Sequence, residues 1–186
     1  MPRRLVKALV VGLVAGALAV GGWATLGGTW RSAGAGGIHV VHSSYAFDVH
    51  DDAKVAGFAD YVVVGTVERV AEVQERHGGT PYTVFDVRVR QTLKGRPVRT
   101  LRVTQLGGTL GDETWRVAGE PLLETGTTYV LAARTERGRG THQLVGGADF
   151  PVVDETAVTA GASRPVAEWR RNVADQRWPE ELPPAH

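Results

Sequence analysis

Alternating apolar and polar residues between Tyr82 and Gly95 constrain the fold of this 186-residue chain more than any other feature. The stretch YTVFDVRVRQTLKG separates into two sets of alternate positions. The mostly apolar set is Thr83, Phe85, Val87, Val89 and Leu93, and the polar set is Tyr82, Asp86, Arg88 and Arg90. Successive side chains of a strand point to opposite faces, so this period of two predicts a β-strand with one buried face.

Four further segments are rich in β-branched residues and are bounded by glycine, proline or charged turns. They are YVVVGTVERVAEV (61–73), RTLRVTQLGG (99–108), TTYVLAART (127–135) and THQLVGGADFPVV (141–153). The residues expected to face inward in the second and third of these are Leu101, Val103, Tyr129, Leu131 and Ala133. Five strands of similar size, with few helices and no repeats, predict a mainly β fold in which the sheet closes into a small barrel.

Glycines interrupt or end most of these strands, and we expect their roles to be structural. Gly65 lies inside the first strand, where a residue without Cβ fits a bulge or a tight bend. The others expected to shape turns or kinks are Gly95, Gly107, Gly108, Gly146 and Gly147. Neither LGGTLGDE nor VGGADF has the spacing or the strand-to-helix context of a phosphate-binding loop.

The N-terminus has the pattern of an export element, assigned to residues 1–28. Arg3, Arg4 and Lys7 precede an uncharged stretch that runs from Ala8 to Gly28. This stretch fits a signal peptide cut after Ala24, and it also fits an uncut transmembrane helix, which needs about twenty apolar residues. Because basic residues stay in the cytoplasm, we expect the chain at the cell membrane, single-pass with its C-terminal domain outside, or secreted if it is cleaved.

Residues 29–50 are expected to form a flexible tether and the approach to the domain, since GGTWRSAGAGG (27–37) is rich in glycine and small residues. His39, His42 and His50 lie in this segment, and imidazole is a common metal ligand. The motif H-E-x-x-H is absent, and Asp51 and Asp52 suit the first turn of a short helix. The three histidines are therefore weak candidates for a metal site, and no metal or cofactor is expected.

Residues 161–186 predict a short C-terminal helix and a tail after a barrel domain at 51–160. Ser163 suits an N-cap, Pro165 suits the first turn, and one helical face carries Val166, Trp169 and Val173. Packing of this helix on the barrel is the preferred interpretation. Its arginines next to tryptophans also suit a membrane surface or an acidic partner, but an acidic pair and prolines follow them.

The order of several motifs resembles a known domain. ADYVVVGTV is followed by a strand ending in LKG, then by VTQLGG, PLLETGTTYVL and HQLVGG. Between Ala59 and Val153 this order resembles an uncharacterised domain of exported bacterial proteins, and its layout is similar to the OB-like barrel of netrin and TIMP-like modules. The resemblance implies a five-stranded OB-like barrel. TIMP-like inhibitors act through an N-terminal cysteine, which this chain lacks, so no inhibitory residue is carried over.

Composition and motifs leave two classes of function. A net charge of +1 gives no electrostatic field for recruiting nucleic acid. The exposed face of the strand at 82–95 offers only Tyr82 with Arg88 and Arg90 as nucleic-acid contacts, so nucleic acid is not an expected partner. No serine lies in a G-x-S-x-G motif. The preferred function is a non-enzymatic extracytoplasmic binding module for an unknown protein or small ligand. The alternative is a metal-dependent or other hydrolase whose dispersed site would use His39, His42, His50 and His142.

Overall fold

The computed structural model describes residues 36–76, 79–146 and 150–183, which lie in a compact unit running from Gly34 to His186. The predicted export element at 1–28, the candidate cleavage point at Ala24, and Gly147 all fall outside these residues. Within the described ranges, none of the helices combines the length and the apolar character needed to cross a membrane.

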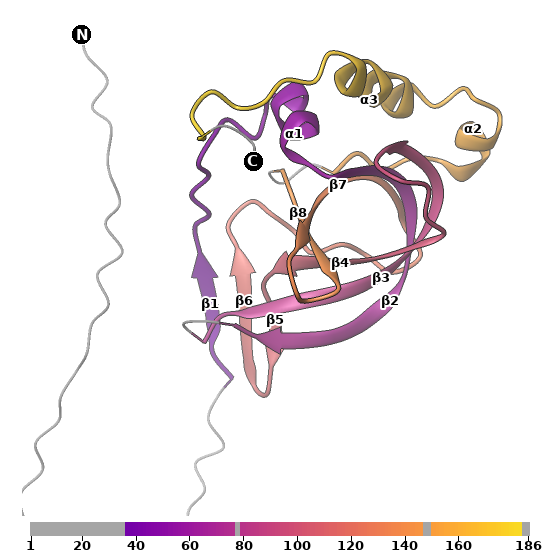
Figure 1. The fold of residues 1–186 in the computed structure, drawn as a ribbon. Coiled ribbons are helices and arrows are strands. Elements are labelled where there is room, and N and C mark those ends of the chain that lie inside the picture. Colours follow the sequence, from indigo (N-terminus) through magenta and orange to yellow (C-terminus); the bar gives the residue numbers. More distant parts are fainter. Residues whose placement is uncertain (1–35, 77–78, 147–149, 184–186) are drawn as a thin grey trace, which may run out of the picture. The chain divides into compact units, whose positions relative to one another are not determined.

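Five strands form a sheet that closes on itself, as Figure 1 shows. They are β2 (Tyr61–Glu75), β3 (Pro81–Lys94), β4 (Thr100–Leu106), β7 (Thr128–Glu136) and β8 (Thr141–Leu144). The order around the ring is β2-β3-β4-β8-β7, and β7 pairs back onto β2. Neighbours are antiparallel except β4 and β8, which are parallel. The prediction of a mainly β chain in which five strands close into one sheet is confirmed.

The inside of the ring is filled by one hydrophobic cluster. All five residues predicted to face inward from β4 and β7 belong to it, together with Val63, Val67, Phe85 and Val87. Phe85, Val87 and Leu131 are among its almost completely buried side chains. The alternation of the sequence therefore identified the buried faces of these strands correctly.

Leu93 is the exception to the predicted alternation. It was expected to share a face with Phe85 and Val87, but it packs against the cluster outside the ring. The pairing of β2 with β3 shifts register between Val62 and Val63 and again between Val64 and Gly65. The shift between Val64 and Gly65 leaves Arg90 as an extra residue of β3, and this bulge reverses the faces of the residues beyond it and turns Leu93 outward.

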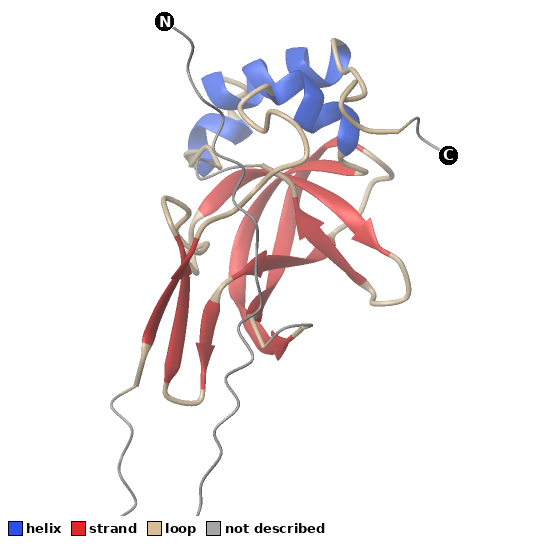
Figure 2. Ribbon diagram, turned by 90° about the vertical axis from the view of Figure 1, so that its left-hand side faces the viewer, coloured by secondary structure: helices blue, strands red, loops and turns tan. Residues whose placement is uncertain are grey.

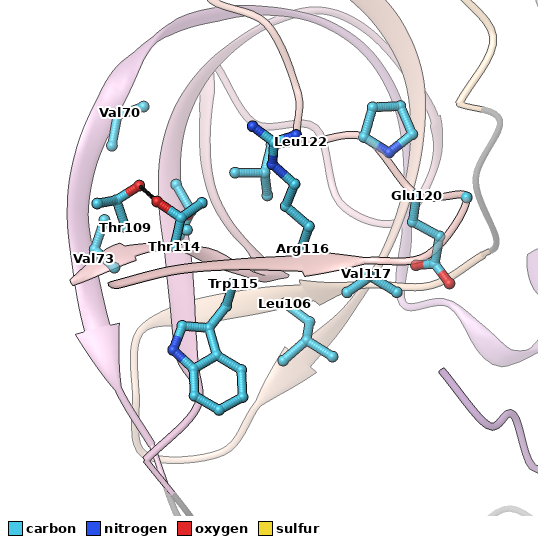
Figure 3. A pocket seen from close by; sticks show the side chains of 14 residues that line it. Val70, Val73, Leu106, Thr109, Thr114, Trp115, Arg116, Val117, Glu120 and Leu122 are labelled. Carbon is cyan, nitrogen blue, oxygen red and sulfur yellow. Dashed lines mark hydrogen bonds between the residues drawn. The ribbon is translucent and has the colours of Figure 1, made fainter. Parts of the chain in front are cut away.

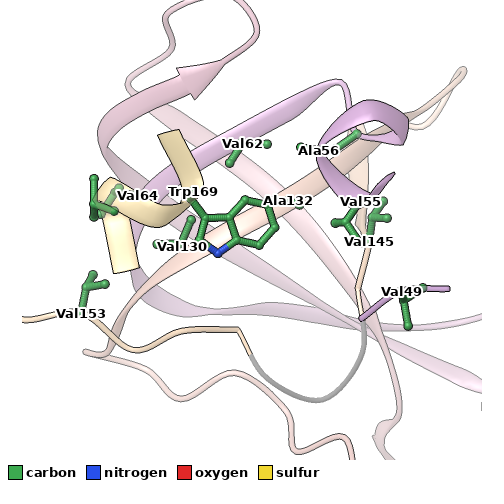
Figure 4. Packing of buried hydrophobic residues seen from close by; sticks show 12 residues of the cluster. Val49, Val55, Ala56, Val62, Val64, Val130, Ala132, Val145, Val153 and Trp169 are labelled. Carbon is green, nitrogen blue, oxygen red and sulfur yellow. The ribbon is translucent and has the colours of Figure 1, made fainter. Parts of the chain in front are cut away.

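Two helices cover one outer face of the ring, as Figures 2 and 4 show. They are α1 (Asp52–Phe58) and α3 (Arg164–Ala174), and a shorter helix, α2 (Glu155–Thr159), precedes α3. Val55 of α1 and Trp169 of α3 pack in one cluster with outward-facing residues of β2 and β7, including Val62 and Val130. The predicted C-terminal helix and its apolar face are confirmed.

The segment after α3 returns across α1 and is fastened to it. The Arg177 backbone N–H donates to the Ala53 carbonyl at 3.1 Å. Lys54 Nζ donates to Glu180 Oε1 at 2.9 Å and to Glu181 Oε1 at 2.7 Å. The acidic pair of the tail thus serves an intramolecular contact that holds the first helix.

A small second sheet was not predicted from the sequence. It contains β1 (Ile38–Val41), β6 (Glu113–Val117) and β5 (Gly108–Leu110) in that order. β1 runs parallel to β6, and β5 pairs antiparallel to its other side. β1 lies in the segment that was expected to be a tether and approach, and it forms the outer side of this sheet in Figure 1.

Candidate functional site

A groove of about 670 Å³ lies between the small sheet and the ring. We call it the small-sheet groove. Its walls come from β2, from the small sheet and from the loop after β6. The side chains used in the argument below are Val70, Val73, Thr109, Thr114, Arg116 and Leu122.

The register of the small sheet decides which side chains face this groove. Thr109 pairs with Thr114, and their hydroxyl oxygens are 3.0 Å apart. Arg116 lies two residues beyond Thr114 in β6, so both side chains are on the same face of the sheet. Figure 3 shows these side chains and Leu122 on one side of β6, with Trp115 on the other side.

Gly108 allows β5 to approach the ring closely enough to form the groove. Its φ is +136°, and a Cβ built on it would lie 2.5 Å from Thr83 Oγ1 of β3. A side chain at this position would therefore be strained by both its backbone conformation and its surroundings. The preceding residue, Gly107, also has a positive φ, of +105°. Its N–H donates a hydrogen bond to the Pro81 carbonyl at the start of β3.

Arg116 and Glu120 are the charged residues of the groove lining, and they differ in how they are paired. Arg116 is exposed, and no described carboxylate lies within ion-pair distance of it. The Glu120 carboxylate instead accepts a hydrogen bond of 2.5 Å from the Tyr45 hydroxyl. Burial, and then this bond to Glu120, raises the pKa of Tyr45 to about 12. The groove thus offers apolar walls and one unpaired guanidinium.

The groove lining contains no nucleophile beside a general base. Its hydroxyl groups belong to threonines, two of which hydrogen-bond to each other, and its described residues include no histidine, serine or lysine. This set of side chains can bind an apolar group and an anion, but it has no arrangement suited to acid–base or covalent catalysis.

The structure does not bring the three candidate histidines together. His39 stacks on Trp115 with ring centroids 4.3 Å apart, and its Nε2 is 3.6 Å from Glu113 Oε2. His42 lines a different pocket, and the His50 backbone N–H donates to Asp48 Oδ1 just before α1. No group of three or more His, Asp or Glu side chains suited to a metal ion occurs among the described residues.

His142 lies on β8 in a separate environment. Its Nδ1 is 3.2 Å from Thr135 Oγ1, and its ring meets Tyr61 edge-on with centroids 4.8 Å apart. Burial lowers the pKa of His142, which favours the neutral imidazole. These contacts account for its position as part of the packing at one end of the ring.

A buried ion pair between Arg76 and Glu136 escaped sequence analysis. Both guanidinium NH groups of Arg76 donate to the Glu136 carboxylate, which also accepts from Thr104 at 3.0 Å and Thr141 at 2.7 Å. Their side chains are only 11% and 12% exposed. The two residues lie 60 positions apart, so no local motif signals the pair. The ion pair joins the residue after β2 to the last residue of β7, and neither residue lines the small-sheet groove.

Gly95 and Gly146, which were also singled out in the sequence, both have a positive φ. Gly95 has a φ of +93° and lies against Asp60 and Tyr61, and Gly146 has a φ of +134°.

Comparison with known proteins adds no assignment, since no family model and no curated protein matches the chain.

Proposed function

We propose that this chain is a non-enzymatic extracytoplasmic binding module built on an OB-like barrel. The Greek-key order of the ring, in which the last two strands exchange places and β7 pairs back onto β2, supports the OB-like assignment. The export pattern of residues 1–28 supports a location outside the cytoplasm, anchored in the membrane or secreted after cleavage at Ala24.

The small-sheet groove is the observation that carries the binding function. Val70 and Val73 supply an apolar wall, and Val70 remains 48% exposed although it lies on a strand of the ring. Apolar hollows with a few fixed polar groups are the usual form of small-ligand and peptide sites. The unpaired Arg116 beside this wall favours a ligand that joins an apolar group to a carboxylate or another anion.

Methyl NMR on the full chain tests this site directly. The probe is 8-anilinonaphthalene-1-sulfonate, which combines aromatic rings with one sulfonate. We expect saturable shifts of the Val70 and Leu122 methyl resonances, while those of Val152, which is 62% exposed and outside the groove lining, stay unchanged. Arg116→Met should weaken binding about 3- to 10-fold, because Arg116 is exposed and its contact with the sulfonate has the net strength of an ordinary hydrogen bond, about 0.5–1.5 kcal/mol.

Leu122→Asp and Val152→Asp form the matched pair of variants. The first places a carboxylate in the groove and should abolish the shift of the Val70 methyl resonances, and the second places one on the surface and should leave that shift intact. Equal shifts in both variants, or shifts at Val152 as large as those at Val70, would refute binding in the groove.

The proposed location has its own test. Alkaline phosphatase fused after His186 should be active in intact cells, because Arg3, Arg4 and Lys7 are expected to hold the N-terminus inside. The mature N-terminal residue then distinguishes cleavage after Ala24 from a retained membrane anchor. An inactive fusion would overturn the extracytoplasmic assignment and would leave the groove experiment untouched.

A further inference from the structure

One edge of the small sheet carries backbone groups that pair with no described strand. The carbonyls of Gly37 and Val41 accept from the N–H groups of Thr114 and Ala118 of the β6 segment at 2.9 and 2.8 Å. Backbone groups of successive strand residues point to opposite sides, so those of Ile38 and Val40 point away from β6. Within the described part of the chain, no strand pairs with this side of β1.

The side chains of β1 leave this edge open. Ile38 is 65% exposed and Val40 is 60% exposed, and among the described large apolar side chains only Val152 is comparably exposed. No Lys, Arg, Asp, Glu or Pro occurs from Ile38 to Phe47. Proteins usually block edge strands with charges, prolines or bulges, and β1 has none of these devices.

We propose that two copies of this chain associate by antiparallel pairing of their β1 strands. A two-fold axis at His39 places Ile38 of one copy opposite Val40 of the other. Every outward N–H of one strand then meets an outward carbonyl of the other, and the small sheets join into one continuous sheet. The exposed Ile38 and Val40 side chains of both copies form a single apolar stripe on one face of it.

A second copy fits this edge better than a charged peptide does. The segment from Ile38 to Phe47 contains no Lys, Arg, Asp or Glu, and the Glu113 carboxylate that lies 3.6 Å from His39 Nε2 belongs to the same copy. The approach therefore places no Lys, Arg, Asp or Glu of one β1 strand against one of the other. Because β1 has only four residues, the contact is smaller than the roughly 1,200 Å² typical of stable interfaces, and the dimer is weak and concentration-dependent.

Single cysteines test the register, since the chain has none of its own. Directly opposed residues that do not exchange hydrogen bonds have Cα atoms about 4.5 Å apart, within the range for a disulfide. His39→Cys in the full chain should therefore cross-link to a dimer under mild oxidation. In Ile38→Cys the two Cα atoms are about 8 Å apart, beyond disulfide reach, and the yield should be at least 5-fold lower.

Val152→Cys, at another exposed position, measures random collision. His39→Cys combined with Val40→Pro removes one outward N–H but keeps the bonds to β6 and the whole N-terminal stretch, and it should return cross-linking to the Val152→Cys level. A His39→Cys yield no higher than that of Val152→Cys, or below that of Ile38→Cys, overturns the proposal. Cross-linking that Val40→Pro leaves unchanged in a chain of unaltered circular dichroism also overturns it. Both readouts are independent of ligand binding in the groove.

Discussion

A side chain at Gly65 of β2 would occupy the space that Val87 Cγ1 of β3 already fills. The two strands shift register between Val64 and Gly65, so the expected bulge is present. The φ of Gly65 does not lie in the left-handed region, however. Glycine was expected here for a bend at which a side chain would clash, and Val87 inside the ring is the residue that a side chain would meet.

Gly65→Val should therefore destabilise the protein through overpacking. We expect a loss of about 1–3 kcal/mol in the free energy of unfolding, measured with urea. Glu68→Val adds the same side chain at an exposed position of β2 and should change stability by less than about 0.5 kcal/mol. An unchanged or higher melting temperature for Gly65→Val would contradict the packing found at this position.

Trp169→Ala should show that α3 belongs to the core. Trp169 is 5% exposed and packs with Val62 and Val130 of the ring. Replacing a large buried aromatic residue with alanine costs about 3–5 kcal/mol, and calorimetry or urea unfolding should show this loss in a single transition. Arg170→Ala, one residue later on the exposed face, is the control. A separate early transition for the helix would argue against a shared core.

Glu136 should make stability depend on pH at acid values. Burial alone would raise its pKa, but hydrogen bonds from Arg76, Thr141 and Thr104 outweigh burial and hold the pKa below its usual value. The folded state therefore binds the proton less well than the unfolded state does. Its contribution is fully present above the unfolded pKa, about 4.3, and is lost as pH falls through the folded pKa.

Urea unfolding between about pH 7 and about pH 2 checks this behaviour. Glu136→Gln should flatten the acid part of the profile, and Glu136→Ala should cost about 3–5 kcal/mol at neutral pH because Arg76 keeps a buried, uncompensated charge. Glu75→Gln, at an exposed position of β2, is the control. Identical acid slopes for the wild type and Glu136→Gln would show that other carboxylates dominate.

The Tyr45 hydroxyl should titrate unusually late. Its pKa is raised to about 12, first by burial and then by the hydrogen bond to Glu120. NMR of the labelled Tyr45 ring should give this midpoint, and Glu120→Gln should lower it only in part because burial remains. A midpoint at the ordinary tyrosine value of about 10 would mean that the segment before α1 does not lie against Glu120 in solution.

The ring was predictable because its strands are long enough for alternation to be visible. β3 has 14 residues, and its inner face from Thr83 to Val89 keeps a strict period of two. The face of Leu93 was predicted wrongly because a bulge is defined by the pairing of two strands. The sequence of one strand alone does not show how it pairs with its neighbour. The helix start at Asp51 and the apolar face of α3 were visible because capping and helical periodicity are local.

The candidate site was not predictable for the opposite reason. β1, β5 and β6 have only four, three and five residues, too few to display a period. The alternation in ETWRV, between two turns, was the one available signal for β6. The histidines matched a metal site by residue type alone, and whether such residues converge depends on long-range pairing such as that of β1 with β6.

The contact of Arg177 with α1 sets a limit on the order in which the chain can fold. The Arg177 carbonyl lies where a side chain at Gly57 would be, and the Arg177 N–H bonds to Ala53, more than 120 positions earlier in the sequence. Synthesis delivers the N-terminal part first, so α1 lacks its covering segment until almost the whole unit has been made. Contacts this distant in sequence are slow to form, because the closure of the long loop precedes any gain from the contact. Residues made late therefore complete a helix made early, and a chain that stops before Arg177 should expose α1 to proteases.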